Sequence, residues 1–104
     1  MKHKDIYDLL KTLDIPVAYD HFNDDKTINP PFIVYRELGV DTFKADNKTF
    51  YRQYDFELEL ITTKKDTTLR NKIEELLDTN NIPYNTTNEV WDNDEKIYHN
   101  FYEI

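Results

Sequence analysis

The chain contains no cysteine and only one glycine, Gly39, among its 104 residues. Without cysteine, neither disulfide bonds nor thiolate metal sites can form, so packing or assembly with other chains must hold this domain together. A single glycine also excludes the usual glycine-rich phosphate-binding loops. There is no run of about 18 apolar residues and no apolar leader after Met1. We therefore expect neither a membrane span nor a signal peptide, and synthesis in a cytoplasm.

Basic residues are scarce: 13 lysines and arginines stand against 21 aspartates and glutamates, a net charge of −8. This balance repels DNA phosphates and anionic lipids, which argues against duplex binding through a basic patch and against membrane binding. The length fits one domain, residues 1–104, with a core of its own.

Two stretches have the apolar spacing of an amphipathic helix. The first stripe consists of Ile6, Leu9, Leu10 and Leu13, and Asp14 with Ile15–Pro16 predicts its end. The second stripe follows Asp66, whose carboxylate can cap exposed amides, and predicts a helix over roughly residues 67–79. We expect the four apolar residues of this second stripe to lie in the core: Leu69, Ile73, Leu76 and Leu77.

The remaining chain predicts strands and turns. β-branched and aromatic residues favour strands at Pro16–Phe22 and Phe32–Glu37, separated by a polar loop that we expect to be mobile. A long hairpin with a tight turn at Asp46–Asn47 and a shorter hairpin follow. The hairpin strands are expected at Val40–Ala45 with Lys48–Thr63, and at Asn88–Trp91 with Lys96–Glu103. The order α-β-β-β-α-β-β predicts an α+β fold with two helices packed on a largely antiparallel sheet.

The segment YRQYDFELEL, residues 51–60, alternates between apolar and acidic residues. In a strand this alternation predicts one buried face and one anionic face. The buried face would carry Tyr54, Phe56, Leu58 and Leu60, and the anionic face Asp55, Glu57 and Glu59. The carboxylates are compatible with a solvated surface, with a hard-cation site completed by Glu37, or with the lining of a channel.

An enzyme is a poor fit to this pattern. A catalytic pair of carboxyl groups normally converges on a cleft from different elements, whereas these three lie about 6–7 Å apart along one strand. The histidines His3, His21 and His99 lack the spacing that places two imidazoles on one metal ion, and His99 is expected to be a partly buried strand residue. We therefore expect no catalytic residue, metal or cofactor.

Three runs of the sequence resemble small head–tail joining proteins of long-tailed phages that infect Gram-positive bacteria, most closely their tail-completion or tail-terminator proteins. The resemblance covers roughly residues 30–104 and includes the ADNK turn and the closing EKIY and YEI segments. The runs are TFKADNKTFYRQYDFELELITTKKD, LRNKIEELLDTNNIPY and NEVWDNDEKIYHNFYEI. The resemblance implies a non-enzymatic virion subunit, which forms a six-fold homo-oligomeric ring that caps the tail tube and joins it to the head connector.

This resemblance gives the acidic strand face and the turns an expected role. Anionic walls would let DNA pass through a ring without sticking, so Asp55, Glu57 and Glu59 are interpreted as a channel lining. Trp91 and the turn Asp46, Asn47 and Lys48 are expected at a subunit or partner interface. The alternative from another class is a small acidic inhibitor or DNA mimic, whose carboxylates imitate phosphates in the groove of a nucleic-acid enzyme.

Overall fold

The computed structural model describes residues 3–22, 28–45, 48–86 and 89–104, with the backbone alone at 40–45 and 48–54. Its two helices and mostly antiparallel sheet confirm the α+β fold and the predicted order, with one short strand, β4, added. The loop residues 23–27 and the turn Asp46–Asn47 lie outside the described residues. In chain order the elements are α1 (His3–Lys11), β1 (Val17–Tyr19), β2 (Phe32–Ala45), β3 (Lys48–Thr62), α2 (Thr67–Thr79), β4 (Asn85–Thr86), β5 (Val90–Asp92) and β6 (Ile97–Glu103).

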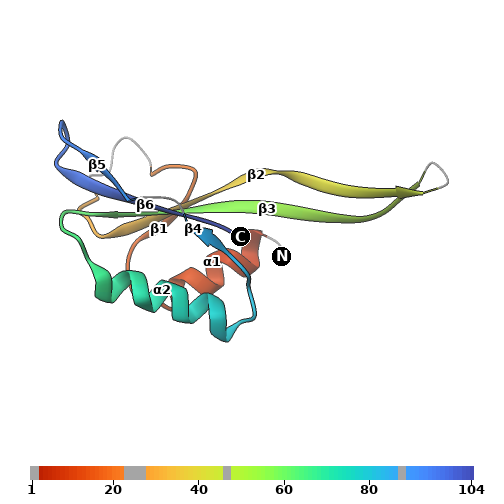
Figure 1. Cartoon of the computed structure of the whole chain (residues 1–104), viewed down its shortest axis with the longest axis horizontal. Helices are drawn as coiled ribbons and strands as arrows, with labels where there is room; N and C mark the ends of the chain where they lie inside the picture. The colour runs from red at the N-terminus through yellow and green to blue at the C-terminus, as the bar shows by residue number, and fades with distance from the viewer. Residues whose placement is uncertain (1–2, 23–27, 46–47, 87–88) are drawn as a thin grey trace.

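The strands form one sheet in the order β1-β2-β3-β6-β4, and β5 also pairs with β6. β1 and β2 are parallel, whereas the other strand pairs are antiparallel. Both helices lie on the same face of this sheet, as Figure 1 shows. We call the opposite face, which the helices leave uncovered, the outer face.

The hydrophobic core lies between the helices and the sheet. Phe56, Leu58 and Leu60 of β3 are each about 1% exposed and confirm the predicted apolar face of this strand. Leu69, Ile73 and Leu77 of α2 pack against them, as predicted. The prediction for Leu76 is wrong: this residue is only partly buried and lines a surface groove between α2 and the end of α1. The α2 face that meets the sheet is therefore narrower than the apolar stripe.

Local hydrogen bonds fix the ends of α2 at the predicted positions. The side chain of Asp66 accepts a hydrogen bond from the backbone N–H of Leu69 at 3.0 Å, which confirms the predicted cap. At the other end, Asn81 adopts a left-handed conformation (φ 57°), and the N–H of Ile82 donates to the carbonyl of Leu77 at 2.9 Å. This arrangement satisfies carbonyl groups of the last turn and stops the helix.

The hairpin of β2 and β3 is the longest feature of the molecule, which measures 52 × 32 × 24 Å. β2 runs without a break across the predicted boundary after Glu37, because Leu38 is accommodated as an irregularity in the pairing between Glu37 and Gly39. Beyond Gly39 and Asp55, the two strands pair only with each other within the described residues. We call residues 40–45 and 48–54 the hairpin arm; it extends far beyond the helices (Figure 1).

Tyr102 makes the core sensitive to alkaline pH. Burial raises its pKa above the ordinary value of 10.0, with Arg70 opposing and Glu74 adding to the shift. Because the unfolded chain then loses this proton first, the free energy of unfolding should fall as pH rises from 10 through the raised native pKa. Replacing Tyr102 with Phe should make this fall shallower, measured by urea unfolding at pH 9 and pH 11. Equal falls in both proteins would contradict this assignment.

Candidate functional site

The acidic side chains of β3 lie on the outer face, opposite the buried apolar residues, which confirms the predicted alternation from Asp55 to Leu60. They do not form one free anionic row. The side chains of Glu57 and Glu59 are only 21% and 13% exposed, respectively. A fully solvated surface, one of the interpretations left open for these carboxylates, therefore does not describe these two residues.

Arg36 of β2 explains how two carboxylates are accommodated so close together. Its Nη1 donates to Oε1 of Glu57 at 2.6 Å, and its Nη2 donates to Oε1 of Glu59 at 3.1 Å. Burial alone would lower the pKa of Arg36, but hydrogen bonds to Glu59 and Glu57 outweigh it and raise this pKa above its usual value. The guanidinium group therefore stays charged and neutralises part of the acidic face.

The contacts continue to both sides of this centre. Oε2 of Glu59 lies 2.5 Å from Nδ1 of His99 on β6, and Nε2 of His99 lies 3.9 Å from Oδ2 of Asp92. On the other side, Oδ1 of Asp20 lies 3.8 Å from Nε of Arg36. We call the six residues the ionic cluster: Asp20, Arg36, Glu57, Glu59, Asp92 and His99.

The ionic cluster leaves little support for a cation site on β3. Arg36 occupies the position between Glu57 and Glu59 where a hard cation would need to bind. Glu37, the expected additional ligand, is the register partner of Phe56 rather than of an acidic residue. Across the described ranges, no group of three or more histidine, aspartate or glutamate side chains has an arrangement that could hold a metal ion.

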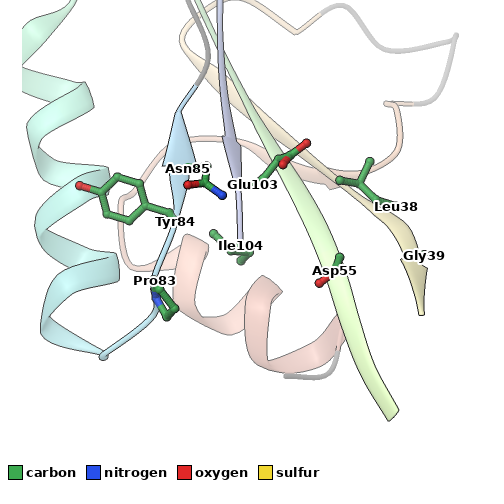
Figure 2. Close-up of a pocket in the computed structure, with 8 residues that line it drawn as sticks. All are labelled: Leu38, Gly39, Asp55, Pro83, Tyr84, Asn85, Glu103 and Ile104. Atoms are coloured by element: carbon green, nitrogen blue, oxygen red, sulfur yellow. The ribbon is translucent and has the colours of Figure 1, made fainter. Parts of the chain in front are cut away.

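Asp55 lies in a different environment from Glu57 and Glu59. It lines a pocket of about 610 Å³ at the base of the hairpin arm. Figure 2 shows hairpin residues on one side of Ile104 and the segment 83–85 on the other. We call this feature the root pocket. Its lining residues are Leu38, Gly39, Asp55, Pro83, Tyr84, Asn85, Glu103 and Ile104.

Of the remaining residues singled out in the sequence, Trp91 and Lys48 lie outside both the ionic cluster and the root pocket, whereas His99 belongs to the ionic cluster. Trp91 sits on β5, is 43% exposed, and its ring centroid lies 4.5 Å from that of Tyr98. Lys48 begins β3, whereas Asp46 and Asn47 are outside the described residues. His99 is 23% exposed and lies in β6, as expected, and His21 contacts Asp20 at 3.0 Å near the surface. The described residues that were predicted are thus spread over the ionic cluster, the root pocket, β5 and the hairpin arm rather than gathered in one site.

One feature of the sequence could have predicted the contact between Arg36 and Glu57 in the ionic cluster. If the two strands paired residue by residue, without a bulge, outward from a two-residue turn at Asp46–Asn47, Arg36 would lie opposite Glu57. The structure has this pairing, although two register shifts intervene, one near Phe43 and one near Leu38. The shifts cancel because each strand contributes one extra residue. Arg36 is also the only basic residue in the stretch FIVYRELGV.

No protein-family model matches this chain. A search of curated proteins likewise found no match. Among the described residues, no helix has both the length and the apolar character needed to cross a membrane.

Proposed function

We propose that the chain is a structural virion protein, a ring-forming tail-completion or tail-terminator subunit at the head–tail junction of a long-tailed phage. In this role it binds further copies of itself, six in one ring, together with the tail-tube protein and the head connector. DNA passes through the ring without being bound, and no enzymatic activity or cofactor is required. The subunit is made in the cytoplasm of the host bacterium and ends in the virion.

The observation that carries the proposal is the hairpin arm. A two-stranded ribbon is marginally stable in water when nothing packs against it. Residues 39–45 advance about 20 Å from the base of the arm at ~3.4 Å per residue, a reach sufficient to contact a neighbouring subunit. Such an arm suits a protein that must join other chains, and an enzyme has no evident use for it.

The ionic cluster changes which charges of the proposed ring would repel DNA. Glu57 and Glu59 are mostly buried and paired with Arg36, so a channel lining cannot rest on them. Net repulsion of phosphates would come instead from the overall charge of −8 on each subunit. The same pairing weakens the alternative of a DNA mimic, which requires accessible carboxylates at regular spacing.

Shortening the hairpin arm tests the proposal. Gly39 and Asp55 are register partners, so an Asn-Gly turn can replace residues 40–54. The body should still fold, because its core residues lie outside the arm. In a phage that depends on this chain, the shortened protein should fail to restore joined heads and tails, as seen by electron microscopy.

This experiment needs a control variant and has two outcomes that would contradict the proposal. Asp94→Ala, in the exposed turn between β5 and β6, should restore joined particles as well as the unaltered chain does. Normal particles in a phage lacking the chain altogether would contradict the proposed function. Tight binding of the monomeric chain to a nucleic-acid enzyme, with no association with tail tubes, would favour the DNA mimic.

A further inference from the structure

The root pocket combines apolar walls with an acidic rim. Leu38 is 49% exposed there, and Tyr84 and Ile104 are partly buried. Asp55 and Glu103 add two carboxylates to the lining. Lysine and arginine side chains match this combination, because their aliphatic stems cover apolar surface while their charged ends meet carboxylates. A basic segment is therefore the occupant that the chemistry of the pocket favours.

The hairpin arm differs in charge from the rest of the chain. Residues 40–54 contain three basic side chains, Lys44, Lys48 and Arg52, and two acidic ones. The remaining residues contain ten basic and nineteen acidic side chains, a net charge of −9. An arm with a net charge of +1 on an otherwise acidic protein is attracted to the body of another copy.

The arm and the root pocket are different surfaces of the same molecule. A contact between the arm of one copy and the pocket of the next is head-to-tail, and repeating it closes a ring when the rotation per step is suitable. The pocket lies at the base of the arm (Figure 2), so each subunit would receive one arm where its own arm begins.

We infer that the root pocket receives the hairpin arm of a second copy, and that this contact links successive subunits. The inference rests on the proposed ring and names the site through which the ring is held. Asp55 and Glu103 supply the acidic side chains of this contact, and Glu57 and Glu59 hold Arg36 within the subunit.

Complementary charge reversal tests this contact. One variant carries Asp55→Lys with Glu103→Lys in the pocket, and the other carries Lys44→Glu, Lys48→Glu and Arg52→Glu in the arm. Each variant alone should associate at least tenfold more weakly than the unaltered chain in sedimentation velocity. An equimolar mixture should recover association, because each interface then pairs an acidic partner with a basic one. The control Asp94→Lys with Glu95→Lys, in an exposed turn, should associate normally.

Engineered cysteines provide a second readout that does not depend on charge. The chain has no cysteine, so Leu38→Cys with Lys48→Cys allows only engineered disulfides. Oxidation should produce a ladder of covalent oligomers, whereas Asn93→Cys with Lys48→Cys should not. Unchanged association of both charge variants, or the absence of the ladder, would overturn the inference. The tail-joining phenotype is measured separately, so the proposed function can survive that result.

Discussion

Glu57→Lys combined with Glu59→Lys is expected to destabilise the protein strongly. The two carboxylates are mostly buried and share the guanidinium of Arg36, so the substitution would place three cations together in a partly desolvated site. Breaking a buried ion pair typically costs about 3–5 kcal/mol. That loss is comparable with the total stability of a small domain, roughly 5–15 kcal/mol. Circular dichroism at 25 °C and a urea titration would measure the loss.

The third acid of the strand provides the matched control. Asp55→Lys changes charge on the same face of β3, but Asp55 lies at the root pocket and outside the ionic cluster. The single variant should keep the fold and should associate more weakly than the unaltered chain. Glu57→Gln with Glu59→Gln should be intermediate, because amides can still accept hydrogen bonds from Arg36. A stable double-lysine variant would show that the ionic cluster contributes little to folding.

Ile73→Ala is expected to have the second largest effect, a loss of about 2–5 kcal/mol in the free energy of unfolding. Ile73 is 1% exposed and packs in the core between α2 and the sheet, so truncation leaves a cavity there. The melting temperature should fall by more than about 10 °C in a domain of this size. A thermal melt followed by circular dichroism measures the shift.

Leu76→Ala is the control for that substitution, with the same helix and a similar side chain. Leu76 is only partly buried beside the groove at the end of α1, so its truncation should cost roughly 1 kcal/mol or less. If both variants melted at the same temperature, the assignment of the buried face of α2 would be wrong. A larger loss at Leu76 would indicate that the groove is covered by another chain.

Local patterns predicted much of the fold because the forces behind them act between neighbours in sequence. Helix α2 was found from its apolar spacing and from Asp66, whose carboxylate caps the amide of Leu69 three residues away. Alternation along β3 correctly assigned Phe56, Leu58 and Leu60 to the buried face. The apolar stripe misassigned Leu76, because spacing marks a helix face but does not give the width of the surface that packs on it.

The sequence by itself determined that this is one α+β domain without disulfides and with a strongly acidic composition. It also determined that one strand alternates between buried apolar side chains and acidic side chains. Tertiary structure alone decided the state of those charges. Whether a carboxylate is free or paired depends on which residue the strand pairing places opposite it. Here the register of β2 with β3 places Arg36, 21 residues away in sequence, opposite Glu57. The root pocket depends in the same way on tertiary structure, because it joins the base of the hairpin to residues 83–85 and 103–104, which only folding brings together.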